Sequence, residues 1–207
     1  MKENYHKLCL EEIKNITTKK KILLHSCCAP CSSYVITFLS DYFDITVLYY
    51  NPNIYPYEEY EKRKKEQIKL INTLKTKNKL NFLDCDYDNN LYNKTIKGLE
   101  QCKEGGNRCN LCFNLRLEKT AILAKEQNYD YFCSTLTVSP HKNSKLINEI
   151  GEKISNTYDI KWLYSDFKKN EGFKQSIELS KKYELYRQDY CGCIYSKKQR
   201  EEEKNNI

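Results

Sequence analysis

The chain has 207 residues, of which 40% are hydrophobic and 30% are charged, and its formal net charge is +7. This length suits a hydrophobic core of its own, and we expect residues 1–207 to form a single α/β domain. The longest apolar runs are only a few residues long, so we expect no membrane-spanning segment, and residues 1–4 begin no secretory signal. A cytoplasmic protein is the natural interpretation, and the excess of Lys and Arg permits, without requiring, binding to nucleic acid.

Helical and β patterns alternate along the chain. Apolar residues at helical spacing predict helices, and β-branched or aromatic runs bounded by Gly, Pro or Asn predict strands. Such alternation is typical of a mostly parallel sheet flanked by helices. A leading helix falls within residues 1–20, and we expect the charged tail at 196–207 to be a frayed helix or disordered. In chain order, we expect helices at 5–19, 32–39, 58–74, 91–99, 109–123, 146–150 and 174–182, and strands at 22–24, 45–50, 80–83, 129–133 and 161–164.

Three cysteines stand on the turn between the first strand and the helix that follows it, at Cys27, Cys28 and Cys31. This turn lies at the carboxyl edge of the predicted sheet, where open α/β sheets bind ligands. The amino end of a helix favours thiolate over thiol, and Ser32 or Ser33 can cap this helix. Three thiols crowded at this edge predict a metal site.

Other cysteines form two close pairs, and some stand alone. Eleven cysteines in a reducing compartment are not typical of a disulfide framework and favour metal binding or redox work. A free cysteine without a close neighbour is most often buried, so we expect four of them to pack in the core. The pairs are Cys109/Cys112 and Cys191/Cys193, and the isolated cysteines are Cys9, Cys85, Cys102 and Cys133.

The number of grouped thiols bears on the identity of the metal. Structural zinc takes four ligands, so one zinc ion leaves three of the seven grouped thiols unexplained. Adjacent Cys27 and Cys28 point in different directions, which suits an iron–sulfur cluster or two metals better than one small ion. Zinc and a metal-free site stay open as alternatives. The single glycine between Cys191 and Cys193 allows a small, strained disulfide, but two metal ligands or two free thiols fit the same spacing.

Five unusual sequence blocks occur in one order between about Lys21 and Tyr195. They are HSCCAPC, NPNIYPYEEYEKRK, EGGNRCNLCFNLRLEKTA, STLTVSPHKN and DFKKNEGFKQSIELSKKYELYRQDYCGC. Together these blocks closely resemble the epoxyqueuosine reductases of the QueH family. The resemblance implies a Rossmann-like (HUP-like) fold and a cytoplasmic oxidoreductase that removes the epoxide oxygen of epoxyqueuosine at the wobble position of tRNA. The product is queuosine, and the reaction is the last step of its biosynthesis in tRNA.

The resemblance also implies cofactors and their ligands. Members of the family carry a [4Fe-4S] cluster with an additional mononuclear iron beside it. Some relatives have Asp at the position of Cys31, and because a carboxylate or a thiolate can hold an iron ion, we expect Cys31 to bind the second iron. The implied cluster ligands are Cys27, Cys28, Cys109 and Cys112, and Cys191 and Cys193 match a pair regarded as a redox-active disulfide.

Deoxygenation of an epoxide requires two electrons, a Lewis acid and protons. We expect an external electron donor of the ferredoxin or flavodoxin type. His25, two residues before Cys27, is the expected proton donor or substrate contact. Weaker candidates for the proton donor are Asp86, Tyr190 and His141. The expected contacts to tRNA phosphates are Arg63, Arg108, Lys142, Lys168, Lys169 and Arg187.

Two rival functions remain to be weighed. The strand, turn and helix at 22–39 are similar to those of ATP-dependent tRNA thiolases, but the glycines that let phosphate approach the backbone are missing here. The other alternative is a zinc-stapled module that binds tRNA without catalysis. The colour of protein purified without oxygen separates the alternatives, because an iron–sulfur cluster is brown and zinc is colourless.

Overall fold

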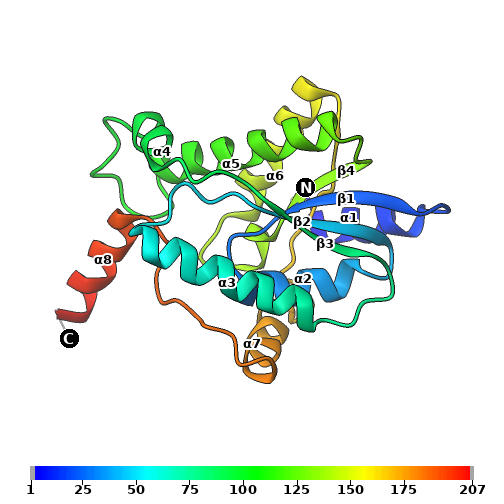
Figure 1. Cartoon of the computed structure of the whole chain (residues 1–207). Helices are drawn as coiled ribbons and strands as arrows, with labels where there is room; N and C mark the ends of the chain where they lie inside the picture. The colour runs from blue at the N-terminus through cyan, green and yellow to red at the C-terminus, as the bar shows by residue number, and fades with distance from the viewer. Residues whose placement is uncertain (1–2, 206–207) are drawn as a thin grey trace.

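A computed structural model describes residues 3–205, and its centre is one sheet of parallel strands (Figure 1). The strand order is β3-β2-β1-β4-β5, and every neighbouring pair is parallel. This arrangement confirms the α/β prediction of a mostly parallel sheet. The strands are β1 (Lys20–His25), β2 (Phe43–Tyr49), β3 (Leu80–Asp84), β4 (Tyr131–Ser134) and β5 (Lys161–Trp162).

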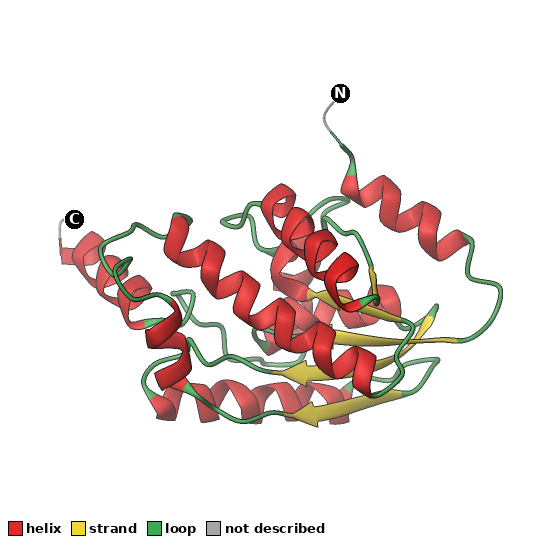
Figure 2. Cartoon of the chain, turned by 90° about the horizontal axis from the view of Figure 1, so that it is seen from above, coloured by secondary structure: helices red, strands yellow, loops and turns green. Residues whose placement is uncertain are grey.

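Helices cover both faces of the sheet (Figure 2). Helices α1, α2, α3 and α7 share one apolar cluster with the strands, and α5 and α6 share another. The helices are α1 (Tyr5–Lys14), α2 (Ala29–Leu39), α3 (Tyr57–Thr73), α4 (Asn89–Thr95), α5 (Asn107–Glu126), α6 (Ser144–Tyr158), α7 (Gly172–Lys182) and α8 (Ile194–Asn205), with the short 3₁₀ helix η1 (Thr135–Val138) after β4.

The pleat of β1 explains why its residues are apolar without a break. Successive side chains of a strand point to opposite faces of the sheet. Ile22 and Leu24 therefore pack in the cluster with α2, whereas Leu23 packs in the cluster with α5. All three side chains are fully buried. A strand covered on both faces is expected in a parallel sheet with helices on either side.

The two ends of the chain differ in detail from the predictions. Helix α1 ends at Lys14 rather than at residue 19, because the N–H of Asn15 closes the last turn on the carbonyls of Glu12 and Ile13. Residues 196–205 of the expected tail belong to α8. Residues 1–2 and 206–207, which belong to the predicted leading segment and tail, lie outside the described part of the chain.

The strand order creates a crevice at one edge of the sheet. The chain runs outward from β1 through β2 to β3, and then returns to the other side of β1 to form β4 and β5. The loops that follow β1 and β4 therefore run in opposite directions from the carboxyl ends of these neighbouring strands. Open α/β folds bind ligands at such a position. The strand arrowheads point toward the side of the molecule on which α8 lies (Figure 2).

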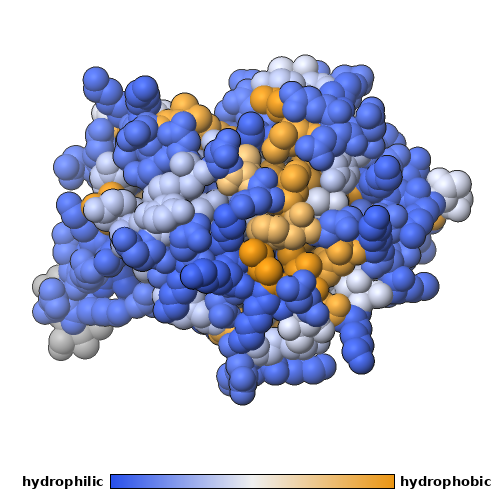
Figure 3. Space-filling model, viewed as in Figure 1, coloured by the Kyte–Doolittle hydropathy of each residue, from blue (hydrophilic) through white to orange (hydrophobic). Residues whose placement is uncertain are grey.

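The outer surface is mostly hydrophilic (Figure 3). Apolar residues gather on the face that Figure 3 shows, in the region where Figure 1 places β3, the edge strand. Residues 80–83 of β3 are partly exposed. Over residues 3–205, no helix combines the length and the apolar character that crossing a membrane requires.

Gly172, the first residue of α7, should be intolerant of a larger side chain. We expect Gly172→Ala to lower the free energy of unfolding by about 1–3 kcal/mol, because an added Cβ would overlap the carbonyl oxygen of Phe167 and the ring of Tyr34. Urea denaturation measures the change. The exposed Lys174→Ala on the same helix is the control, with an expected change within about 0.5 kcal/mol. Equal stability of the two variants would refute this packing argument.

Candidate metal centre

The cysteines after β1 lie at and just before the start of helix α2. Cys28 is the residue before the helix, in an extended conformation, and Cys31 lies in the first turn. The ligand atoms of Cys27, Cys28 and Cys31 all lie within 4.8 Å of one another. Thiolates grouped at this distance are suited to binding a transition metal such as iron or zinc.

The start of α2 differs from the prediction. Ser32 and Ser33 do not cap the helix but lie inside it, and the Ser32 hydroxyl lies 3.1 Å from the carbonyl oxygens of Cys28 and Ala29. Pro30 interrupts the apolar pattern and suggested a turn. Proline is nevertheless favoured in the first turn of a helix, where its missing N–H costs nothing. The helix therefore begins at Ala29 and places Cys31 in its first turn.

A buried amide on α3 braces the cysteine turn. The Oε1 atom of Gln67 accepts hydrogen bonds from the hydroxyls of Ser26 at 2.6 Å and Ser32 at 2.8 Å. On the other side of the turn, the amide of Asn51 donates to the carbonyl of Ser26 at 2.8 Å. All four side chains are buried. These bonds fix the backbone of the turn, and with it the directions of the thiols.

The pKa values of the three thiols are shifted in opposite directions. Hydrogen bonds from Cys28 and Cys31 hold the pKa of Cys27 well below its usual value, and the nearby charge of Lys142 lowers it further. The bond to Cys27 raises the pKa of Cys28 to about 12 and also raises that of Cys31. The group thus favours one thiolate that two thiols stabilise. A bound metal cation would take the place of the remaining protons.

A cavity of about 580 Å³ opens beside these thiols. Its walls come from the start of α2, the segment after η1, α7, the segment between α7 and α8, and α8 itself. The lining holds three thiols and four side chains of Arg or Lys, together with the carboxylates of Glu104, Asp189 and Glu203. Thiols beside cations suit a metal centre next to an anionic ligand. The lining includes Cys27, Cys31, Cys191, Arg116, His141, Lys142, Arg187, Tyr190 and Arg200.

The second cysteine pair lies on the first turns of α5. Cys112 is buried, and Cys109 is partly exposed. One turn later, the Nε–H of Arg116 donates to the carbonyl of Cys112 at 3.1 Å. Burial disfavours a charge on Arg116, but the sulfurs of nearby cysteines raise its pKa in spite of burial. These cysteines are Cys112, Cys191 and Cys27, so all three cysteine groups lie within electrostatic reach of one guanidinium.

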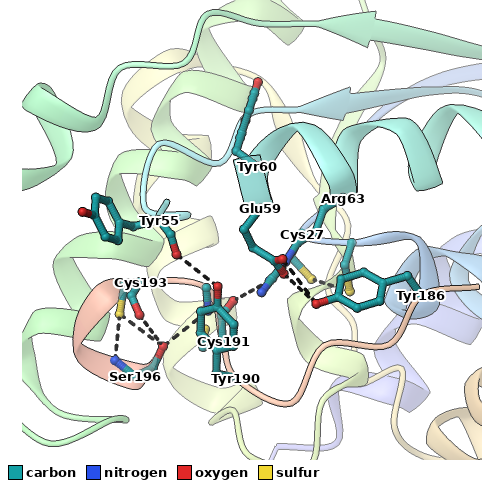
Figure 4. A network of polar contacts seen from close by, with 12 residues as sticks. Cys27, Tyr55, Glu59, Tyr60, Arg63, Tyr186, Tyr190, Cys191, Cys193 and Ser196 are labelled. Atoms are coloured by element: carbon teal, nitrogen blue, oxygen red, sulfur yellow. Dashed lines mark hydrogen bonds and ion pairs between the residues drawn. The ribbon is translucent and has the colours of Figure 1, made fainter. Parts of the chain in front are cut away.

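The third pair lies on the turn that leads into α8, and both its sulfurs are free thiols (Figure 4). Cys191 lines the cavity. Cys193 is buried, and its sulfur lies 3.4 Å from the hydroxyl of Ser196. Gly192 between them has φ +137°, a backbone conformation that residues other than glycine rarely adopt.

Comparison with known proteins identifies the family. A family model described as epoxyqueuosine reductase QueH matches residues 22–199. The chain belongs to the epoxyqueuosine reductase QueH family. Among proteins named epoxyqueuosine reductase QueH, one from Streptococcus pyogenes serotype M1 is 46% identical over 184 residues, which cover 88% of this chain and 72% of the relative. Another, from Thermotoga maritima, is 34% identical over 189 residues, which cover 90% of this chain and 95% of the relative.

A solved structure shares the fold of this QueH chain. It is the U34-tRNA thiolase NcsA from Methanococcus maripaludis with its [4Fe-4S] cluster. The TM-score is 0.52 at 12% sequence identity, and the alignment covers 92% of this chain and 69% of that one. At this identity the likeness bears on the fold alone, and it confirms the predicted fold class.

Membership of the QueH family confirms the predicted enzyme class. The chain is an oxidoreductase, an epoxyqueuosine reductase of queuosine biosynthesis. The rival interpretations, a zinc-stapled binding module and an ATP-dependent thiolase-like enzyme, are not favoured. In the structure, Pro30 lies where a phosphate-binding turn would present backbone N–H groups to ATP, and proline has none.

His25 lies away from the cavity of this QueH chain. Its side chain is fully buried, and its two ring nitrogens contact the hydroxyl of Ser134 at 2.9 Å and the carbonyl of Tyr50 at 3.1 Å. A carbonyl only accepts, so Nε2 carries the proton and Nδ1 accepts from Ser134. Burial lowers the pKa of His25 to about 3. This environment holds a neutral imidazole and gives no direct support to the predicted role of proton donor.

The predicted phosphate contacts divide into four groups. Arg63 and Arg108 are buried and donate to backbone carbonyls, so the prediction that they contact phosphates was wrong. Lys168 pairs with Asp166 at 2.6 Å, which reduces its availability. Only Lys142 and Arg187 of the predicted set line the cavity, whereas Lys169 is exposed elsewhere.

The isolated cysteines are less uniform than predicted. Cys9 and Cys133 are buried in the core, as expected, but Cys85 and Cys102 are only partly buried. Arg116 was missed by the sequence interpretation. Its position four residues after Cys112, on the same face of a helix, could have revealed it.

Proposed function

We propose that this chain converts the epoxide of epoxyqueuosine in tRNA to the alkene of queuosine, and that the reaction takes place at the thiol-lined cavity. The overall change consumes two electrons and two protons and releases the epoxide oxygen as water. The observation that carries the proposal is the group of Cys27, Cys28 and Cys31 within 4.8 Å, at the carboxyl edge of the sheet in a QueH chain.

The cysteines of this site fit an iron centre. We assign a [4Fe-4S] cluster to Cys27, Cys28, Cys109 and Cys112, and an additional mononuclear iron to Cys31. Within residues 3–205, only Cys27, Cys28 and Cys31 form a group at single-ion distance. A cluster with iron atoms at several corners spreads its ligands further apart than one ion does. When bound, the iron centre would supply a Lewis acid and single electrons.

The Cys191/Cys193 pair would provide a two-electron store. Closing a disulfide between them releases two electrons and two protons, which is what the epoxide requires. An external donor of the ferredoxin or flavodoxin type would then reduce the disulfide back to two thiols. The position of Cys191 in the cavity lining supports this role.

Protons would come from groups that face the cavity. Tyr190 and His141 line it, whereas Asp86 does not. In this proposal His25 acts by position, because its hydrogen bonds to Ser134 and Tyr50 tie the end of β1 to β4 and to the segment after β2. The thiol turn that follows β1 is held in place through these bonds.

Cations around the cavity would bind the tRNA backbone. Lys142 and Arg187 line the cavity, whereas Arg200 is already paired with Glu203 at 2.8 Å. The anticodon loop is single-stranded, and two phosphate contacts predict that the logarithm of the tRNA association constant falls with the logarithm of salt concentration with a slope of about −1.4. Filter binding between low and high KCl measures this slope. A flat response would contradict electrostatic binding of tRNA.

The direct test is turnover with the proposed substrate. Metal-loaded protein, prepared without oxygen, is given tRNA that contains epoxyqueuosine together with a reduced flavodoxin. Mass analysis of the digested nucleosides should show queuosine replacing epoxyqueuosine. Unchanged epoxyqueuosine with iron-loaded, reduced protein would overturn the proposed function.

A further inference from the structure

The segment between α7 and α8 carries the dithiol but belongs to no sheet and, before Ile194, to no helix. Contacts from other elements, by side chains and by the backbone, therefore hold it in place. Figure 4 shows contacts to the dithiol turn from α3, from the loop before α3 and from Ser196 of α8, whose hydroxyl accepts from the N–H of Gly192 at 3.3 Å. Among the residues of α3, Arg63 reaches the backbone of the dithiol turn itself.

Arg63 is a buried cation with three kinds of partner. Its side chain is 1% exposed, and its Nε lies 2.7 Å from an oxygen of Glu59, one turn earlier on α3, whose side chain is 12% exposed. Its Nη1 donates to the carbonyl oxygen of Cys191 at 3.1 Å. The guanidinium also lies over the ring of Tyr190, 4.9 Å from the ring centre. One side chain thus joins α3 to the backbone of the dithiol turn.

Contacts on both sides of Arg63 extend this attachment. The hydroxyl of Tyr186 donates to Glu59 at 3.2 Å, so the carboxylate holds both Arg63 and the start of the segment. The hydroxyl of Tyr190 donates to the carbonyl of Tyr55 at 3.0 Å. The N–H of Tyr55 in turn donates to the carbonyl of Gly192 at 2.9 Å. The segment is therefore anchored immediately before and within the dithiol turn.

The packing at Gly192 shows how closely the turn lies on α3. A Cβ built at Gly192 would lie 3.0 Å from Cγ1 of Ile54 and 3.2 Å from Nη1 of Arg63. A Cβ at this position would crowd both side chains, and the positive φ of Gly192 strains any residue other than glycine. The glycine of the Cys-Gly-Cys sequence thus allows the turn to lie against the buried arginine.

We propose that the Glu59–Arg63 pair is a positioning device that holds the Cys191-Gly192-Cys193 turn at the metal cavity. A charged donor on a backbone carbonyl is a strong hydrogen bond, and a buried arginine with a carboxylate partner has little freedom to move. Loss of the pair detaches the turn and exposes Cys193. The role as a holder of the turn stands on the contacts alone, and only its importance for turnover rests on the proposed function.

Alkylation of single cysteines tests the device directly. The metal-loaded, reduced protein is treated with iodoacetamide without oxygen, and mass mapping follows the rate at each cysteine. Arg63→Met should raise the alkylation rate of Cys193 by about tenfold or more, because a charge-assisted bond that closes the turn is lost. Cys9 and Cys133, both buried in the core, should stay as slow as in the unchanged protein. Faster reaction at all three would indicate general unfolding and would overturn the specific role.

A matched control and a milder variant complete the test. Lys64→Met removes the neighbouring charge of α3, which pairs with Asp84 and touches nothing in the dithiol segment. This variant should leave the alkylation rate of Cys193 unchanged. Should Arg63→Met fail to fold, Tyr190→Phe, which removes only the bond to Tyr55, should accelerate Cys193 by a smaller factor. Unchanged Cys193 reactivity in the folded variants would refute the proposal.

A second readout links the device to turnover. Reduced protein mixed with epoxyqueuosine tRNA, without an external donor, should form queuosine once per chain as the dithiol closes to a disulfide. Arg63→Met should lower the rate of this single turnover with little change in tRNA affinity, whereas Lys64→Met should not. If the unchanged protein forms no queuosine in this way, the proposed relay fails, while the alkylation result still decides the positioning role.

Discussion

Cys28→Ser should remove the iron centre from the protein. Cys28 is buried between Cys27 and the first turn of α2, and its sulfur lies 3.9 Å from that of Cys27. A serine hydroxyl stays protonated at neutral pH and binds iron far more weakly than a thiolate does. We expect the variant purified without oxygen to lose most of its iron and its brown colour. Iron analysis and the visible absorption spectrum measure the loss.

The control for this experiment is Cys102→Ser. Cys102 is partly buried, does not line the cavity and has no cysteine beside it in sequence. Its replacement should leave the iron content and the spectrum as they are in the unchanged chain. A Cys28→Ser protein that keeps its full iron content would show that the assigned ligand set is wrong.

The double variant Cys191→Ser, Cys193→Ser should abolish turnover but keep the iron centre. Cys191 lies in the cavity lining, and neither sulfur is assigned to iron. We expect the rate to fall by at least about 100-fold, the scale associated with loss of a correctly placed reacting group. The measurement is queuosine formation with a strong artificial donor, which can load the iron centre directly. The absorption spectrum serves as the internal control.

Two outcomes of that experiment are informative in opposite directions. Loss of activity with an intact spectrum assigns the dithiol an obligatory part in electron transfer. Full activity with the artificial donor would rule the dithiol out as an obligatory relay and leave repeated loading of the iron centre as the electron source.

The sheet could be predicted from the sequence because its central strands contain short, continuous runs of apolar or β-branched residues. The apolar run Ile22-Leu23-Leu24 and the β-branched run of β2 are continuous, as buried parallel strands require. The start of α2 could not be placed correctly, because Pro30 reads equally as a turn and as part of a first helical turn. The sequence also showed the thiol turn at the carboxyl edge, since a strand followed by a helix fixes that position.

The remaining features depend on contacts between distant residues. Arg63 and Arg108 look like surface cations in a charged, polar sequence, and only tertiary structure reveals that both are buried and donate to backbone carbonyls. The environment of His25 depends on Ser134, which is 109 residues away in the chain. Spacing alone therefore suggested a catalytic histidine, whereas the structure places a neutral, buried imidazole at this position.

The central claim is that sulfurs from separate segments hold iron at one edge of the sheet. Mössbauer spectroscopy of protein purified without oxygen from cells grown on ⁵⁷Fe, combined with sulfide analysis, tests it most directly. We expect the signature of a [4Fe-4S] cluster, acid-labile sulfide to match, and a smaller separate signal from the additional iron. A colourless protein that contains zinc and no labile sulfide would contradict the account.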